Sequence, residues 1–314
     1  MSLAPPAISV AVCTRNRPDD LRECVATILA NEGTPFELLV IDQSDGEGSR
    51  RTLGPAVDDP RVRYVATDTR GVSRSRNLAI EHARSETLLF TDDDCRVPPD
   101  WVANAWSVLQ RDPQTAVACG RVRPPPGVPE GVIATFEPLT EEVFEGRYPS
   151  PMRPWGVTAN MLVRRRVFEA IGGFDPLLGP GGELLCGEDT DLLLRALGAG
   201  YRVRETRAFE VTHLGVRTGR EAGALFATYA VGTGAAYAKN ARLRTPGATG
   251  LGVRLVVSTV AAIVKNVFIM GRPRGARFLL HLSRGAALSF RYRLDRREGC
   301  FMPNPPRSVA EGTE

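Results

Sequence analysis

Thr91-Asp92-Asp93-Asp94-Cys95 is the stretch of sequence that decides the fold. It follows Glu86-Thr87-Leu88-Leu89-Phe90, a short apolar run typical of a buried strand. Ligands of open α/β sheets bind beyond the carboxyl ends of the strands, where these carboxylates stand. If the chain stays extended, Asp92 and Asp94 share one face and Asp93 takes the other. Two carboxylates on one face favour a divalent cation such as Mg²⁺ or Mn²⁺. The alternative is a solvated acidic turn.

Composition is that of a globular protein, but the charge is uneven. The chain has 314 residues, of which 43% are hydrophobic and 24% charged, with a net charge of +4. Residues 1–213 carry 24 Arg against 31 acidic residues, and residues 214–314 carry 16 basic against 5 acidic residues. A basic carboxyl-terminal third indicates an anionic partner, either a membrane or a nucleic acid.

Cysteine usage indicates a reducing compartment. The six cysteines are scattered and form no CxxC pair, which argues against a zinc site and against a disulfide framework. The amino terminus lacks the basic start and long apolar core of a signal peptide. We therefore expect a cytoplasmic protein.

Strand-like and helix-like segments alternate through the first two-thirds of the chain. The predicted strands are residues 8–13, 36–41, 62–65, 86–92, 115–122 and 156–163, with one or two short strands in 201–211. The predicted helices are residues 18–29, 73–83, 100–110 and 164–171, with another opening at Gly187. This alternation predicts an α/β protein with a mixed, mostly parallel sheet flanked by helices. Residues 124–154 hold eight of the 24 prolines and are predicted to be a long substrate loop over the sheet.

The last hundred residues differ in character. Three helical patterns appear, near 220–240, 251–270 and 273–292. We predict a catalytic domain at 1–215, a helical basic region at 216–303 and a disordered tail at 304–314. Helix 251–270 has the length of a membrane span, but Arg254 and Lys265 interrupt it. We therefore expect the carboxyl-terminal third to bind an anionic membrane surface peripherally, on the cytoplasmic side, and not to bind nucleic acid. The alternative is a soluble helical subdomain.

Six stretches together resemble family 2 glycosyltransferases, which use the GT-A nucleotide-sugar-binding fold. They are residues 10–17, 40–45, 71–77, 90–95, 155–173 and 187–194, in the expected order and over about two-thirds of the chain. The most specific parts are the DDD run, an Asn-containing strand before Gly172-Gly173-Phe174-Asp175, and Gly187-Glu188-Asp189-x-Asp191. The resemblance implies an inverting, metal-dependent glycosyltransferase that makes polysaccharide, glycolipid or another glycoconjugate from a UDP-, GDP- or dTDP-linked sugar.

The resemblance also implies roles for individual residues. Asp189 would be the catalytic base that deprotonates the acceptor hydroxyl. Asp94, Asp92 and His213 would hold Mn²⁺ or Mg²⁺. The donor nucleotide and diphosphate would contact Thr14, Arg15, Asp42, Arg70, Gly71, Arg76, Asn77, Asp92 and Asp93. Candidates for the acceptor side are Trp155, Asn160, Glu188 and Asp191.

Two rival functions remain at this point. A sugar-phosphate nucleotidyltransferase shares the α/β architecture, but its Gly-rich phosphate loop should follow the first strand, where residues 13–17 contain no glycine. A non-catalytic nucleotide-sugar-binding protein is opposed by the intact carboxylates at positions 92, 94 and 189.

Overall fold

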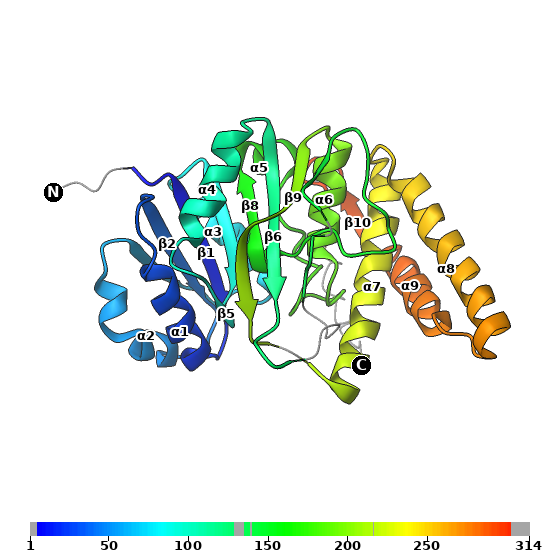
Figure 1. Cartoon of the computed structure of the whole chain (residues 1–314), viewed down its shortest axis with the longest axis horizontal. Coiled ribbons are helices and arrows are strands. Elements are labelled where there is room, and N and C mark those ends of the chain that lie inside the picture. The colour runs from blue at the N-terminus through cyan, green and yellow to red at the C-terminus, as the bar shows by residue number, and fades with distance from the viewer. Residues whose placement is uncertain (1–4, 129–134, 139, 216, 303–314) are drawn as a thin grey trace, which may run out of the picture.

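The computed structural model describes residues 5–128, 135–138, 140–215 and 217–302. A twisted sheet lies at the centre with helices on both sides, and the carboxyl-terminal helices form the right-hand end of the molecule (Figure 1). The tail predicted at 304–314 lies outside the described residues.

The main sheet is mixed. Its strands are β1 Ile8–Thr14, β2 Phe36–Asp42, β3 Val62–Ala66, β4 Thr87–Asp92, β5 Cys95–Arg96, β6 Thr115–Arg123, β7 Glu142–Phe144, β8 Met161–Arg164 and β9 Arg202–His213. Their order is β3-β2-β1-β4-β8-β6-β9-β5, and β7 pairs with β9. The first four strands in this order are parallel, while β8 is antiparallel to both of its neighbours. The predicted mixed α/β sheet is confirmed.

Helices cover the sheet on both faces. They are α1 Pro18–Leu29, α2 Gly48–Leu53, α3 Val72–His82, α4 Trp101–Arg111, α5 Arg165–Ile171 and α6 Glu188–Gly198, with short 3-10 turns at Gly54–Asp58 (η1) and Thr158–Asn160 (η2). Pro18 opens α1, where its missing N–H costs no hydrogen bond. The central strands are buried and mostly apolar because helices cover both of their faces.

Parallel pairing brings the functional strand ends together. In the β1–β2 register Thr14 stands opposite Asp42, and in the β1–β4 register Cys13 stands opposite Asp92. These ends form one edge of the sheet, as expected for an open α/β fold. The site is therefore positioned by the sheet itself.

Two predictions about local backbone are wrong. The chain does not stay extended through the carboxylates: β4 ends at Asp92, residues 93–94 form a turn, and β5 then pairs with the end of β9. Residues 201–211 do not form short strands, because β9 is one 12-residue strand that ends at His213. Its bulges against β6 let it bend without breaking.

The carboxyl-terminal helices share the hydrophobic core of the sheet domain. They are α7 Gly219–Leu243, α8 Ala248–Met270 and α9 Ala276–Ser289, followed by a hairpin of β10 Arg293–Asp295 and β11 Cys300–Met302. A Cβ on Gly285 would lie 1.8 Å from the Val231 carbonyl oxygen, so α7 and α9 approach as closely as glycine allows. Tyr237, Leu251 and Leu282 belong to the same buried cluster as the strands.

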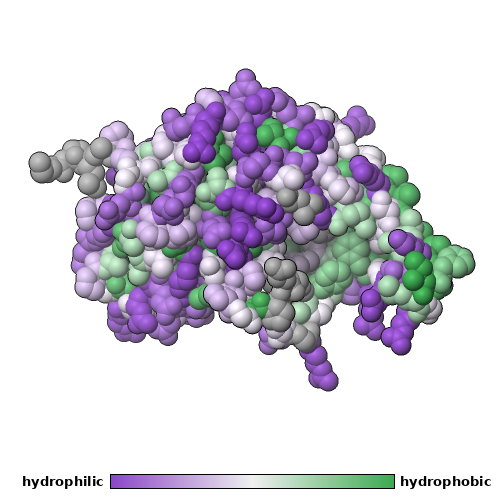
Figure 2. All heavy atoms as spheres, viewed as in Figure 1, coloured by the Kyte–Doolittle hydropathy of each residue, from purple (hydrophilic) through white to green (hydrophobic). Residues whose placement is uncertain are grey.

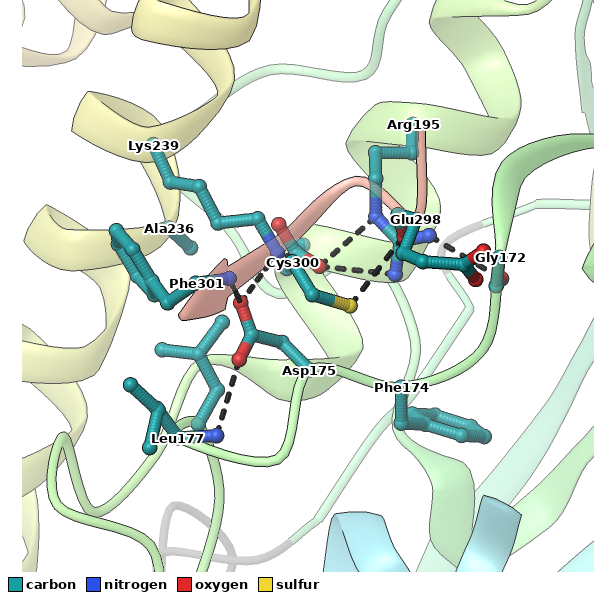
Figure 3. A network of polar contacts seen from close by, with 12 residues as sticks. Gly172, Phe174, Asp175, Leu177, Arg195, Ala236, Lys239, Glu298, Cys300 and Phe301 are labelled. Atoms are coloured by element: carbon teal, nitrogen blue, oxygen red, sulfur yellow. Dashed lines mark hydrogen bonds and ion pairs between the residues drawn. The ribbon is translucent and has the colours of Figure 1, made fainter. Parts of the chain in front are cut away.

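A buried ion network joins α6, α7 and β11 (Figure 3). Lys239 is fully buried, and its Nζ lies 2.7 Å from Asp175 and 2.9 Å from Asp191. Arg195 lies 2.9 Å from Asp191, and the Phe301 backbone N–H donates to Asp175 over 2.8 Å. Two cations balance two anions, so the network is neutral as well as fully hydrogen-bonded.

Candidate active site

The carboxylates at the end of β4 meet His213. Nε2 of His213 lies 3.4 Å from Asp94 and 3.8 Å from Asp92. Burial opposes the charged form of His213, but the adjacent carboxylates of Asp92 and Asp94 raise the imidazole pKa overall. Burial also disfavours ionised Asp92, yet the contacts of Asp92 with His213 and Arg76 lower its pKa to about 2. Asp92 is therefore ionised throughout the physiological range.

Asp93 belongs to the β1 side of the site. It accepts a hydrogen bond from the Thr14 hydroxyl over 2.7 Å, and Arg17 Nη1 lies 3.2 Å from it. The same Arg17 nitrogen lies 3.1 Å from Asp94, so one guanidinium bridges two consecutive carboxylates. Burial raises the pKa of Asp93 to about 6 in spite of these contacts.

Arg76 connects the end of β4 with the start of α6. Its guanidinium is nearly buried and lies 3.2 Å from Asp92, 3.1 Å from Glu188 and 3.8 Å from Asp189. It also lies over the Phe174 ring, 5.5 Å from the centroid. A single fixed cation thus sets the spacing between the two acidic groups that the resemblance implies.

Asp189 lies in the first turn of α6 and is partly exposed. The Thr158 hydroxyl, from η2, donates a hydrogen bond to it. Burial, and next the negative charge of Glu188, raise the pKa of Asp189 to about 8. A raised pKa in a positioned carboxylate is the signature of a general base or acid.

The cluster carries excess negative charge. Five carboxylates, those of Asp92, Asp93, Asp94, Glu188 and Asp189, meet only two arginines and one histidine. Asp94, Cys95 and His213 bring ligand atoms within 4.8 Å of one another. Burial holds the pKa of the Cys95 thiol well above its usual range, so it stays protonated and is a poor ligand. Carboxylate oxygens and imidazole suit Mn²⁺ or Mg²⁺, and they fit such an ion here.

The end of β2 forms a second part of the site. Asp42 is almost fully buried, accepts the Ser44 backbone N–H over 2.8 Å and accepts a hydrogen bond from the Tyr64 hydroxyl. Arg15 and Arg70 are exposed, and both pair with Asp45, at 3.8 and 2.6 Å. These arginines therefore lie beside Asp42 and remain free to exchange an exposed partner for a ligand.

Gly71 opens α3 beside the Gly-rich segment that precedes α6. Its φ of 106° favours glycine, and an added Cβ would lie 3.4 Å from the Gly181 backbone. The N–H of the next residue, Val72, donates to the Pro180 carbonyl over 2.9 Å. The start of α3 is thus tied to the loop that leads to Asp189.

Four residues assigned to ligands by resemblance have structural partners. The Asn77 amide exchanges two 2.8 Å hydrogen bonds with the Phe174 backbone. Asn160 is fully buried between the Trp101 indole and two backbone carbonyls. Trp155 is buried beside Tyr237, and Asp191 belongs to the Lys239 network. Their side chains hold the site's framework together.

Two residues near the carboxylates carried no assignment in the sequence analysis. Arg17 lies three residues after Thr14, and the sequence does not show that its guanidinium bridges Asp93 and Asp94. Tyr229 comes from α7, where burial raises its pKa and nearby negative charges, including that of Asp189, raise it further. No sequence pattern marks Tyr229, because it lies 40 residues after Asp189.

Comparison with known proteins identifies relatives of this architecture. Residues 9–172 match the family model described as glycosyl transferase family 2. The chain is 31% identical over 224 residues to the O-antigen biosynthesis protein RfbC of Myxococcus xanthus, covering 66% of this chain and 17% of that protein. It is 33% identical over 96 residues to the succinoglycan biosynthesis protein ExoO of Rhizobium meliloti, covering 30% and 27%. The chain thus spans well under half the length of either relative.

Solved structures with the same fold include two transferases. A mannosyltransferase from Pyrobaculum calidifontis, in complex with GDP-Man and Mn²⁺, superimposes with a TM-score of 0.59 at 16% identity, over 92% of this chain and 89% of that one. S. aureus TarS superimposes with a TM-score of 0.54 at 15% identity, over 84% and 44%. At such identities the likeness shows the fold alone, and that fold is the predicted GT-A fold.

Proposed function

Because the chain belongs to glycosyl transferase family 2, we propose that it moves a sugar from a nucleoside-diphosphate donor to an acceptor hydroxyl with inversion. Family membership makes it a glycosyltransferase, which decides against the two rival functions. One observation carries the finer proposal: Arg76 contacts both Asp92 and the Glu188-Asp189 pair. A donor-side carboxylate and a base are therefore held a fixed distance apart, as an in-line displacement needs.

The donor half of the proposal rests on the edge formed by β1, β2 and β4. We assign the nucleotide to Thr14, Arg15 and Asp42, and the diphosphate to the start of α3 with Arg70 and Gly71. Backbone N–H groups at a helix start favour anions, and arginine suits phosphate oxygens. The mannosyltransferase neighbour was solved with GDP-Man, and a structure of S. aureus TarS residues 1–349 was solved with UDP, so either nucleotide is a candidate.

Asp92, Asp94 and His213 are the residues that would hold a divalent cation. When bound, Mn²⁺ or Mg²⁺ would offset the negative charge that grows on the departing diphosphate. Arg17 bridges Asp93 and Asp94, and Arg76 pairs with Asp92. These fixed cations keep the carboxylates in place and supply further positive charge to the leaving group.

Asp189 is proposed as the general base. One of its oxygens would take the acceptor hydroxyl proton while the new bond to the anomeric carbon forms and the bond to the diphosphate breaks. A pKa near 8 makes Asp189 a stronger base than an ordinary aspartate. The Thr158 hydroxyl orients it, and Glu188 supports it through Arg76.

The proposed acceptor is a growing cell-envelope polysaccharide or a lipid-linked sugar. This follows from the relatives, which are named for O-antigen and succinoglycan biosynthesis. All six cysteines are free thiols, in keeping with the cytoplasm, where sugar nucleotides are made.

The proposal is tested by donor binding with and without metal. UDP-, GDP- and dTDP-sugars are screened by thermal unfolding in Mn²⁺ and in EDTA. A donor at 100 times its dissociation constant stabilises a protein by about 2.7 kcal/mol, which is readily measured. We expect one donor class to stabilise the protein in Mn²⁺ only, and turnover with a sugar acceptor to require the metal.

Asp94→Asn supplies the decisive variant, and Asp58→Asn is the matched control because Asp58 is an exposed carboxylate on another surface. Asp94→Asn should weaken donor and metal binding together, while Asp58→Asn should leave both unchanged. Full turnover by Asp94→Asn in EDTA would disprove metal dependence through this residue.

A further inference from the structure

Helix α8 presents an apolar stripe to solvent. Ile269 and Met270 are exposed at its carboxyl end, and its other large exposed side chains are Val253, Val256, Val257, Val260, Val264, Val267 and Phe268. At about 100° per residue they fall on one side of the helix. Phe268 is 85% exposed and Val257 60% exposed, far more than a soluble protein ordinarily leaves on one helix. The hydrophobic surface gathers at the right-hand end of the molecule, over α8 (Figure 2).

The opposite face of α8 is packed on the rest of the chain over its amino-terminal half. Leu251, Leu255 and Thr259 are buried against the rest of the chain. The Thr259 hydroxyl approaches the Met152 sulfur at 3.9 Å. By length and composition α8 could cross a membrane. However, the amino-terminal half of α8 packs on the catalytic domain and cannot be enclosed by lipid, so the helix is suited to lie in an interface.

Positive charge surrounds the stripe. Residues 222–294 contain no Asp or Glu and eleven Lys or Arg. Arg254 and Lys265 lie on one flank of the stripe, and Arg272, Arg274 and Arg277 follow its carboxyl end, all exposed. Within the described residues none of these five forms an ion pair, in contrast to most arginines of the sheet domain. These five cations are therefore available to an anionic partner.

We propose that the apolar stripe of α8 and these cations dock the protein on an anionic lipid surface. Apolar side chains would enter the acyl boundary, while arginines contact lipid phosphates. A second copy of the chain is the weaker occupant, because its own unpaired cations would meet those of the first.

The test is co-sedimentation of the full chain with vesicles. One set contains phosphatidylcholine alone, and the other equal parts of phosphatidylcholine and phosphatidylglycerol. We expect binding to the anionic vesicles that weakens between about 0.05 M and about 1 M salt, because salt screens exposed charges. Soluble recovery under every condition would overturn the proposal. The assay needs no sugar or metal, so its failure is separate from failure of the proposed function.

Two variants and a control identify the surface. R272Q/R274Q/R277Q should lower the partition coefficient roughly 100-fold at low salt. R51Q/R111Q/R166Q removes the same charge from exposed positions on the sheet domain and should bind as the wild type does. V257S/V264S/F268S should lower binding at least tenfold at both salt concentrations. Equal binding by all four proteins would refute the assignment.

Sedimentation velocity without vesicles tests whether a second copy of the chain, and not lipid, covers the apolar stripe. We expect the wild type and V257S/V264S/F268S to have the same oligomeric state. A wild-type dimer that this triple substitution converts to a monomer would show a self-interface and overturn the lipid proposal. Thermal unfolding of each variant confirms that the exposed substitutions leave the fold intact.

Discussion

Two carboxylates only two residues apart on α6 have opposite surroundings. Asp189 is partly exposed among Glu188, Arg76 and Thr158, in a cluster with excess negative charge. Asp191 is fully buried, hydrogen-bonded to Lys239, Arg195 and Asn240, in a network whose charges cancel. Two positions on a helix differ by about 200°, so one acidic run serves two faces. The surroundings of Asp189 leave its carboxyl group able to exchange a proton, whereas those of Asp191 hold its carboxylate paired with cations.

Asp189→Asn should have the largest effect on turnover, and it tests whether the carboxyl group of Asp189 is the reactive one. Removing a general base lowers turnover by about 10²–10⁴-fold, because the acceptor proton loses its destination. Donor and Mn²⁺ affinity should be unchanged in calorimetric titrations. Because the pKa of Asp189 is about 8, kcat/KM of the wild type should rise with pH toward that value. A collapse of donor affinity instead would make Asp189 part of the donor site.

Lys239→Met should disrupt the neutral ion network around Asp191. Removing one partner of a buried ion network costs about 3–5 kcal/mol of unfolding free energy, because Asp175 and Asp191 keep their charge without it. Denaturant unfolding measures the loss. Lys265→Met is the matched control, since Lys265 is the other lysine of the chain and is exposed, and it should change stability by less than about 0.5 kcal/mol. Similar values for both would contradict the contrast drawn here.

Asp93→Asn should alter how stability depends on pH. Burial raises the pKa of Asp93 to about 6, above the value of about 3.9 in an unfolded chain. Between these values the folded protein holds more protons, so wild-type unfolding free energy should fall as pH rises from about 4 to about 6. The asparagine variant should lack on the order of 2 kcal/mol of that fall in metal-free buffer. Parallel curves for the two proteins would show that Asp93 ionises normally.

Thr158→Val should have the smallest effect. The Thr158 hydroxyl donates to Asp189, so its loss should slow turnover about fivefold to tenfold and raise the pH at which kcat/KM levels off. Ser107→Ala, on α4, serves as control because it likewise removes one hydroxyl hydrogen bond, the one to the Asn104 carbonyl. An unchanged pH profile would mean that Thr158 does not tune the base.

The sequence predicts the parts of the molecule that are local. The apolar run before Asp92 and the turn residues after each strand predict an α/β sheet with carboxylates at its edge, and both are observed. Pairings between distant segments are not encoded in such patterns. The 12-residue strand β9 and its pairing with β5 could therefore not be predicted and are seen only in the structure.

In the candidate site, too, the sequence predicts local features but not the contacts between distant segments. Asp92, Asp94 and His213 meet as expected, although the turn at residues 93–94 replaces the extended chain assumed for them. Asn77 and Asn160 look like ligand residues in the sequence, but their amides bond to backbone groups far along the chain. A polar side chain and its sequence neighbours do not reveal whether its partner is a substrate or a carbonyl.

The hydrogen bond from Phe301 to Asp175 has a consequence for how the chain folds while it is being synthesised. Asp175, Asp191 and Arg195 leave the ribosome together, but Lys239 and Phe301 follow 44 and 106 residues after Arg195. At about 5–20 residues per second the last partner emerges roughly 5–20 s later. Asp175 and Asp191 lack their lysine until Lys239 emerges, and Asp175 lacks its backbone donor until Phe301 emerges. A nascent chain stalled before residue 301 should therefore be far more sensitive to protease than the released protein.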